Sequence, residues 1–436
     1  STMKRFMHST AFHHRPAFVI ILLILIVSPW PLGSNRDWAW PALAILSGLA
    51  ALTANFGIRN QLSIHHKVVL AALGFLVCFI LLQLHGIPAL IEPTTQYFYG
   101  TRADLTKTIM YMGFFYATVQ LVDSHDRCRM VVYLIVIIGL LQALVGGTQQ
   151  LMFELPRARG SFPNPNHFAG YLEVALSLAI GAMIADRSNS GGTDSRSLRA
   201  TIVDIITGPL ARLRLVIIIM VIALVMSRSR MGNIAFFSSI MITAAVAFYY
   251  TRSFSRYTAI LLVSILAIDV LIISKYFGIE QLAERFRETT IVSDGRVDLL
   301  SYNLAVFKDH VWLGTGAGSY EVAFSPYRDA DITRKISHTE NDYIEFLIEL
   351  GIIGSLPLLI ILVAGLHSQV RLLGGLAHPF ERGIAFGCLA GTISLLIHGT
   401  ADVNLQIPSN TLLFILLLAI PIALDQASQQ RREGFS

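Results

Sequence analysis

The chain has 436 residues, of which 54% are hydrophobic and only 14% are charged. This balance is too apolar for a water-soluble protein of this length and indicates a membrane protein. The net charge of +5 does not indicate nucleic-acid binding, because membrane proteins gain basic residues in their cytoplasmic segments. The three cysteines have no paired spacing, so neither a disulfide framework nor a zinc site is expected.

Apolar runs long enough to cross a bilayer recur along the whole chain, since about 20 helical residues span the hydrocarbon. They predict an all-α polytopic membrane protein with about twelve transmembrane helices in a single membrane domain, 1–436. We expect the helices at roughly 17–33, 38–56, 67–86, 106–123, 130–149, 166–186, 213–227, 231–250, 257–275, 342–366, 383–401 and 409–425. The sequence contains no internal repeat.

The distribution of Lys and Arg predicts the orientation of these helices. With the N-terminus inside, most basic residues fall in the cytoplasmic segments and few in the short outer loops. This bias predicts that both termini lie in the cytoplasm. The basic residues of the longest outer segment, 276–341, are left out of this comparison, because the positive-inside rule applies to short loops.

Two arginines in an outer loop, Arg157 and Arg159, precede the sixth expected helix in LPRARGSFPNPNHFAGYLE. Guanidinium groups bind phosphate oxygens in pairs, and several of them at headgroup depth would suit a lipid-linked diphosphate. Contact with ordinary lipid headgroups is the alternative for any one of them. Asn166 is expected to cap the helix, while Asn164, Asn166 and His167 could equally bind sugar hydroxyls.

Arg228 and Arg230 occur in SRSRMGN, a connection of only a few residues between two expected helices. An arginine at the membrane boundary is costly unless it meets an anion or water. The short turn makes simple contact with lipid headgroups a weaker explanation here than for a single loop arginine.

The long outer segment, 276–341, contains RVDLLSYNLAVFKDHVWLGTGAGSY, which opens with Arg296. Its apolar spacing predicts an amphipathic helix lying on the membrane or on the helix bundle. The apolar face is expected to consist of Val297, Leu300, Leu304 and Val311. The glycines of GTGAGSY resemble a phosphate-binding loop only weakly, because no strand precedes them and no Lys follows.

The stretch ISHTENDYIEFLIELGIIG, residues 336–354, begins polar and continues as an apolar helix. The positive end of a helix favours carboxylates, and capping explains one or two of the polar residues. It does not explain His338 beside Glu340, followed by Glu345 and Glu349 in an expected membrane helix, where ionisable groups are functional by default. His338 or Glu340 is therefore the candidate general base, and Asn341 a candidate ligand of a sugar.

Two further features of the later helices are weaker signals. Gly351 and Gly354 would allow close packing against another helix. His398 and Asp402 are candidates for the lining of the same site, with a buried and satisfied pair as the equal alternative.

The motifs RARGSFPNPNHFAGYL, SRSRMGNIAF, DGRVDLLSYNLAVFKDHVWLGTGAGSY and HTENDYIEFLIELGIIG occur in this order. Together they resemble the O-antigen ligase and polymerase superfamily of polytopic membrane glycosyltransferases. The resemblance covers about 155–357, and the remaining helices match only as hydrophobic topology.

The resemblance implies a GT-C-like bundle in the bacterial inner membrane, with the long periplasmic loop before the tenth helix. It implies an inverting glycosyltransferase that uses an undecaprenyl-diphosphate-linked glycan at the periplasmic face, without cofactor or metal. Arg230 and Arg296 look like the arginines that hold the donor diphosphate, and Arg159 is similar to an arginine proposed for polymerases.

One departure bears on the acceptor. The ligase pattern places a His before Asn, Ser or Gln, then nine residues, then Gly-x-x-Gly, which puts Glu340 where the His is expected. This favours a polymerase of O-antigen or exopolysaccharide repeat units, whose acceptor is a second lipid-linked glycan. The alternatives are a ligase that uses lipid A core, a branch that modifies protein Ser or Thr, and, more remotely, a lipid-linked glycan transporter. For a polymerase, a chain-length regulator would be a further partner.

Overall fold

The computed structural model describes residues 15–55, 62–189, 210–251, 259–260, 263–264, 295–328, 335–374 and 377–433. Within these ranges the chain forms helices and no strands, which confirms the expected all-α membrane fold. The longer helices are α2 (Arg15–Val27), α3 (Trp40–Asn55), α4 (Ile64–His85), α5 (Phe98–Leu121), α6 (His125–Leu151), α7 (Pro165–Asn189), α9 (Ala211–Met226), α10 (Arg230–Thr251), α13 (Gly295–Asp309), α15 (Asp342–Leu373), α16 (Pro379–His398) and α17 (Pro408–Glu433). The short ones are α14 (Tyr320–Phe324), η2 (Leu32–Ser34), η3 (Ser325–Tyr327) and η4 (Asn404–Gln406).

Most of the expected membrane helices are present. Within the described ranges, seven helices are long and apolar enough to cross a membrane: α4, α6, α7, α10, α15, α16 and α17. Four helices outside this group, α2, α3, α5 and α9, also coincide with expected spans. The expected span 257–275 lies mostly outside the described residues.

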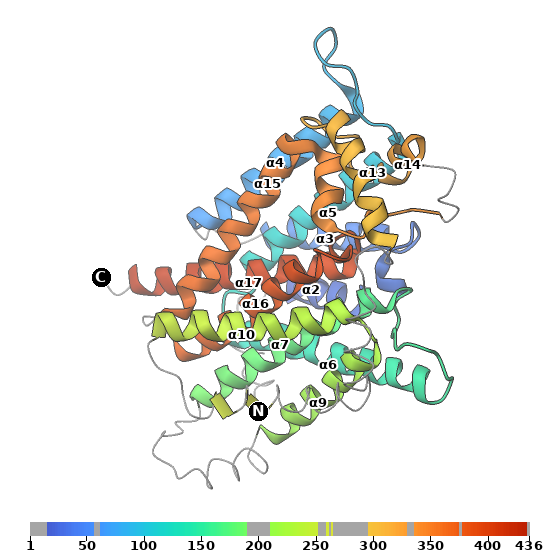
Figure 1. The fold of residues 1–436 in the computed structure, drawn as a ribbon. Helices are drawn as coiled ribbons and strands as arrows, with labels where there is room; N and C mark the ends of the chain where they lie inside the picture. Colours follow the sequence, from blue (N-terminus) through green and yellow to red (C-terminus); the bar gives the residue numbers. More distant parts are fainter. Residues whose placement is uncertain are drawn as a thin grey trace.

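The helices form a bundle (Figure 1), and α7 is the most deeply buried of its candidate membrane spans. The apolar stretch of α7 is 94% buried within the protein, and its main partner is α16. Glycines bring these two helices close together, because a Cβ atom on Gly181 would lie 2.7 Å from the Gly383 carbonyl oxygen. Small residues at a helix contact allow this approach in membrane proteins.

One end of the bundle gathers the loops that carry the candidate residues. The connections 28–39, 152–164, 227–229 and 399–407 meet there, joined for example by the Ala158 N–H, which donates to the Met226 carbonyl at 3.1 Å. Figure 1 shows α13 and α14 at the same end, beside the start of α15. We call this end of the bundle the site end.

Helix α15 breaks at Gly351, where the backbone has a φ of +63° that favours glycine. The break places Glu345 and Glu349 in a short first half, ahead of the longer apolar half that ends at Leu373. Gly354 packs on the ring of Phe79 in α4, which confirms the close helix contact expected for it. Gly351 has a different role from the expected one, because it ends one helix and starts another.

The segment 311–317 fills the break in α15 with hydrogen bonds. Four backbone bonds join the two: Ile352 N to Val311 O at 2.8 Å, Ile353 N to Trp312 O at 3.3 Å, Thr315 N to Ile348 O at 2.9 Å and Gly316 N to Glu349 O at 3.0 Å. Gln83 of α4 adds side-chain bonds to the carbonyls of Leu313 and Glu349, at 2.7 and 2.8 Å. Of the GTGAGSY glycines, Gly314 allows this close backbone contact with α15, while Gly316 and Gly318 pack against the segment 95–104.

Helix α13 confirms the helix expected in the long segment, and it packs on the bundle. The expected apolar face is wrong, however, because Leu300 and Leu304 are more than 40% exposed. Leu299 and Val306 are buried instead, in a small core with Tyr320 of α14 and Ile348 of α15. The buried stripe is rotated by about one residue, since it follows the packing partner rather than the most apolar positions.

Candidate active site

The first residue of the site is the cap of α15. The Asn341 Oδ1 accepts hydrogen bonds from the backbone N–H groups of Tyr343 and Ile344, at 3.0 and 3.1 Å. Its Nδ2 donates to the Thr400 carbonyl at 2.8 Å. Asn341 thus starts the helix and ties it to the connection between α16 and α17, which leaves one amide hydrogen for a ligand.

His338 and Glu345 form a close pair at the start of α15. The His338 Nδ1 lies 2.7 Å from the Glu345 Oε1, and the carboxylate is nearly buried while the imidazole is 37% exposed. The other carboxylate oxygen accepts from the Thr339 N–H at 2.8 Å. A buried carboxylate therefore orients an accessible imidazole, with the Nδ1 held and the Nε2 on the opposite side of the ring.

The charge of Glu345 changes the titration of His338. Burial favours the neutral imidazole, but the carboxylate of Glu345 outweighs burial and raises the pKa of His338 from 6.5 to about 9. The imidazole therefore holds a proton at neutral pH and gives it up only in alkaline solution.

Glu340, the other candidate base, is half-buried and has a φ of +61°. This left-handed conformation costs a residue with a Cβ atom about 1–2 kcal/mol. Hydrogen bonds of the neighbouring Thr339 stabilise this conformation. The Thr339 N–H donates to the Glu345 carboxylate, and the Thr339 hydroxyl donates to the Asn341 carbonyl at 2.6 Å. Strained backbone of this kind concentrates at functional sites.

The candidate arginines differ in how they are held. Arg157 donates from Nε to the Ser227 carbonyl at 2.7 Å and from its terminal NH2 to the Asn166 Oδ1 at 2.6 Å. Arg159, Arg228 and Arg230 are exposed at the site end. Arg296 lies in the first turn of α13, and its side chain is outside the described part of the chain.

The turn between α9 and α10 is short and strained. Arg228 has a φ of +51°, and the Ser229 hydroxyl accepts from the Gly232 N–H at 3.2 Å to start α10. Arg228, like Glu340, is thus a candidate residue in a conformation that side chains rarely adopt. The turn exposes two guanidinium groups while Ser227 and Ser229 stay buried.

The NPNH segment starts α7 differently from the expectation. Asn164, not Asn166, provides the cap, since its Oδ1 accepts from the Asn166 N–H at 2.9 Å. The reason is that Pro165 takes the first helical position, which suits a residue without an N–H. Asn166 instead binds Arg157, and His167 turns into the bundle, where it is 6% exposed.

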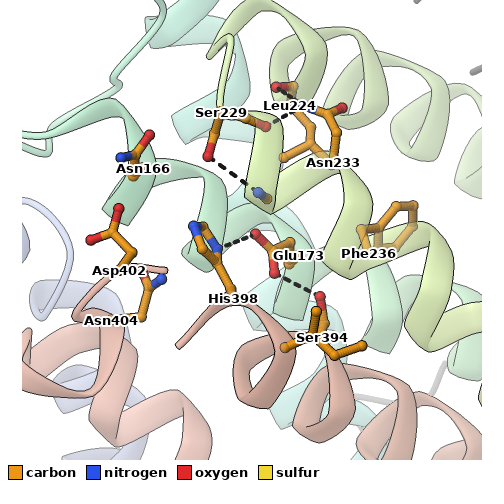
Figure 2. A network of polar contacts seen from close by, with 12 residues as sticks. Asn166, Glu173, Leu224, Ser229, Asn233, Phe236, Ser394, His398, Asp402 and Asn404 are labelled. Atoms are coloured by element: carbon orange, nitrogen blue, oxygen red, sulfur yellow. Dashed lines mark hydrogen bonds and ion pairs between the residues drawn. The ribbon is translucent and has the colours of Figure 1, made fainter. Parts of the chain in front are cut away.

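Two buried pairs of histidine and carboxylate lie behind the site-end surface, and Figure 2 shows the pair of His398 and Glu173. The His398 Nδ1 is 2.7 Å from the Glu173 Oε1, and the Ser394 hydroxyl donates to the other Glu173 oxygen at 2.6 Å. The His167 Nε2 is 3.4 Å from the Asp402 Oδ1. His398 and Asp402 are both buried, as one of the two alternatives had it, but each pairs with a residue of α7 rather than with the other.

The sequence analysis missed Glu173 and gave little weight to the 399–407 connection. The signal for Glu173 was present, because a carboxylate in the middle of an otherwise apolar span needs a partner.

The contact with His167 changes the titration of Asp402. Burial alone would raise the pKa of Asp402, but the effect of His167 outweighs burial and holds that pKa below its ordinary range.

An apolar cavity of about 400 Å³ lies next to the start of α15, between α4, α5, α15 and α17. Leucine side chains such as Leu76, Leu358 and Leu418 form much of its wall. Its polar lining includes Asp342 and Glu349 of α15 and the Lys107–Asp104 pair of α5, whose atoms are 2.9 Å apart. A pocket with mainly apolar walls and a few polar groups is typical of a ligand site.

Among the described residues, no three His, Cys, Asp or Glu side chains are arranged to hold a metal ion. The bundle and the site define a multi-pass membrane protein with a polar centre at one end, beside an apolar cavity.

Residues 215–359 match the model of the O-antigen ligase family. This match supports the O-antigen ligase and polymerase superfamily and glycosyltransferase-type activity in general. It includes the positions of Arg230, Arg296, His338 and Glu340, but not the NPNH segment or the 399–407 connection. No curated protein sequence matches the chain at a significant level.

Proposed function

We propose that the protein transfers a glycan from undecaprenyl diphosphate to an acceptor hydroxyl at the periplasmic face of the bacterial inner membrane. The His338–Glu345 pair carries the proposal, because it supplies an accessible imidazole just before α15, whose residues Asp342 and Glu349 line the apolar cavity. The match to the O-antigen ligase family supports the reaction class.

In this reaction the neutral form of His338, which becomes more populated as the pH rises toward its pKa of about 9, accepts the proton of the attacking hydroxyl. Glu345 fixes the Nδ1 side of the ring, so the Nε2 is the atom that faces the acceptor. The acceptor oxygen forms a bond to the anomeric carbon as the bond from that carbon to the diphosphate oxygen breaks. Attack opposite the diphosphate inverts the anomeric centre, and the diphosphate keeps the bonding electron pair.

The arginines of the site end stabilise the leaving diphosphate. Arg230, Arg159 and Arg228 are exposed there, and Arg296 lies on α13 at the same end. Guanidinium groups aimed at developing negative charge stabilise a transition state without needing a metal. Arg157 supports them, because it joins the turn of Arg228 to the start of α7.

The cavity holds part of the polyprenyl chain of the donor. Its leucine-rich walls suit an isoprenoid, and its polar lining includes residues of the same helix as the His338–Glu345 pair. Asp342 belongs both to this lining and to the turn that follows Asn341. The carrier chain and the reacting sugar would therefore meet at the start of α15.

The acceptor we favour is a second lipid-linked glycan, which makes the protein a repeat-unit polymerase. Glu340 at the position of the ligase histidine supports this choice. Ligation to lipid A core is the second candidate, because the matching family is described as an O-antigen ligase family.

The test uses purified full-length protein with undecaprenyl-diphosphate repeat units, with and without lipid A core, in the presence and absence of EDTA. A ladder of longer lipid-linked glycans without core supports the polymerase. A single shift of the core lipid without a ladder makes the protein a ligase. No product in either reaction, with His338→Ala as the background control, overturns the proposal and reopens transport.

A further inference from the structure

The connection between α16 and α17, residues 399–407, contacts both sides of the candidate site. One side holds the arginines of the 157–167 and 227–230 segments, and the other holds the start of α15 with His338. These two sides come from segments that are more than 100 residues apart in the sequence. Their separation must therefore be set by contacts that cross the bundle.

On the side of α15, the connection is held by four hydrogen bonds. The Asp342 N–H lies 2.9 Å from the Gly399 carbonyl and 3.2 Å from the Asp402 carbonyl. Its carboxylate accepts from the Leu405 N–H at 3.1 Å, and Asn341 donates to the Thr400 carbonyl. Movement of this connection would therefore move the residues next to His338.

On the side of the arginines, the link is made by His167 and Asp402. Their closest atoms are 3.4 Å apart, and the His167 carbonyl accepts from the Asn410 side chain at 3.0 Å. Asn166, the residue before His167, binds Arg157, which in turn bonds to Ser227 in the arginine turn. His167 and Asp402 thus close a continuous path of contacts between the two sides.

The long separation and the incomplete hydrogen bonding of the His167–Asp402 pair argue against a purely stabilising role. Both side chains are nearly buried, at 8% and 2% exposure, and the 3.4 Å contact is longer than a good hydrogen bond. Within the described residues, the His167 Nδ1, the Asp402 Oδ2 and the Asn404 Nδ2 have no hydrogen-bond partner. Burying polar groups in this way costs stability and is weak evidence for a structural purpose.

We propose that His167 and Asp402 are positioning residues that set the separation between the diphosphate-binding arginines and the start of α15. The proposal rests on the proposed glycosyl transfer, in which the base and the leaving group must stand on opposite sides of one carbon atom. Displacement of a catalytic group by about 1 Å can cost roughly a hundredfold in rate. Neither residue needs to contact the substrate itself.

The first test measures glycan transfer by Asp402→Ala, His167→Ala and the double variant of the full-length protein. Each single variant should lower kcat at least tenfold and leave the KM for the donor within about twofold. The double variant should be no slower than the slower single one, because either change breaks the same link. His167→Gln should recover part of the kcat, since its amide can donate to Asp402.

The matched control is His125→Ala, which breaks another pair of histidine and buried carboxylate at the opposite end of the bundle. The His125 Nε2 is 2.9 Å from the Glu381 Oε1. This variant should lower the melting temperature and leave kcat per folded molecule unchanged. If all variants, including this control, lose activity only in proportion to lost folded protein, the positioning role is wrong.

A second measurement does not depend on turnover. Spin labels on cysteines introduced at the exposed residues Phe153 and Ser337, in a Cys78→Ser background, report the distance between the two sides. Asp402→Ala should broaden or shift this distance, and His125→Ala should not. An unchanged distribution in Asp402→Ala overturns the proposal, while an inactive wild-type protein with a shifted distribution would count against the reaction alone.

Discussion

Glu345 holds His338 across the first turn of α15, with 2.7 Å between the Glu345 Oε1 and the His338 Nδ1. The contact combines a residue outside the helix with one inside it, so it depends on the turn that Thr339 and Glu340 make. It also decides the protonation state of the candidate base, from which the first prediction follows.

We expect glycan transfer to rise with pH between about 7 and 9. The pKa of His338 is raised to about 9, and only the neutral imidazole can accept a proton. Glu345→Gln should move the rise toward pH 6.5 and lower the plateau, because the ring loses its orienting charge. The measurement is kcat against pH for both proteins. A wild-type profile that is flat from pH 6 to 9 would point to Glu340 as the base.

The same pair should make stability depend on pH. Because the folded pKa of His338 lies above its ordinary value of 6.5, the contact stabilises fully below pH 6.5 and is lost as pH rises through 9. The melting temperature should therefore fall over this range, and His338→Gln should show a smaller fall. Equal slopes for the two proteins would contradict the assigned pKa.

Substitutions at the two candidate bases should separate catalysis from strain. His338→Ala should lower kcat about a hundredfold or more, the usual effect of losing a general base. Glu340→Gly should raise the melting temperature, since glycine adopts the φ of +61° without strain. If Glu340→Gln, which keeps the shape, abolishes transfer while His338→Ala retains it, the roles are reversed.

The turn between α9 and α10, which carries Arg228 and Arg230, should bind the diphosphate of the donor. Arg230→Ala should raise the KM for the undecaprenyl-diphosphate donor and weaken inhibition by free undecaprenyl diphosphate, and Arg230→Lys should recover only part of both. Arg212→Ala changes an exposed arginine near the start of α9, at the opposite end, and should have no effect. Equal effects of the two alanine variants would show that general surface charge, rather than a site, attracts the donor.

Filling the cavity should block the carrier chain. Leu358→Trp places a large ring among the lining residues, while Leu356→Trp lies on the outer side of the same helix, where the side chain is 51% exposed. Labelling by a photoreactive polyprenyl diphosphate should fall several-fold in Leu358→Trp and stay unchanged in Leu356→Trp. Unchanged labelling of both would place the chain elsewhere.

The break in α15 should be intolerant of side chains. Gly351→Ala combines a positive φ with a Cβ atom directed at the Trp312 carbonyl, and we expect a loss of about 2–4 kcal/mol in unfolding free energy. Gly48→Ala, in α3 with nothing within 4 Å, should instead stabilise by about 0.5–1 kcal/mol. Thermal unfolding in detergent compares the two.

The helices could be predicted from the sequence because each apolar run is a local signal that the bilayer enforces. Local signals also selected His338, Glu340 and the arginines of the α9–α10 turn as candidates, which stay predictions. The partners could not be predicted, since Glu173 meets His398 and His167 meets Asp402 across more than 200 residues of sequence. The prediction of the buried face of α13 was wrong for the same reason, because packing against Ile348, and not the composition of the helix, determines which residues are buried.

Hydrogen bonds join the 311–317 segment to the break in α15 at Gly351, so these two parts of the chain are expected to move together. The two parts lie in different surroundings. The first part connects α13 to α14 at the site end, and the second is a wall of the apolar cavity. Because backbone hydrogen bonds join them, a displacement of the first part would also displace the second. Under the proposed function, this coupling would let a glycan that binds at α13 and α14 influence how tightly the carrier chain is held in the cavity.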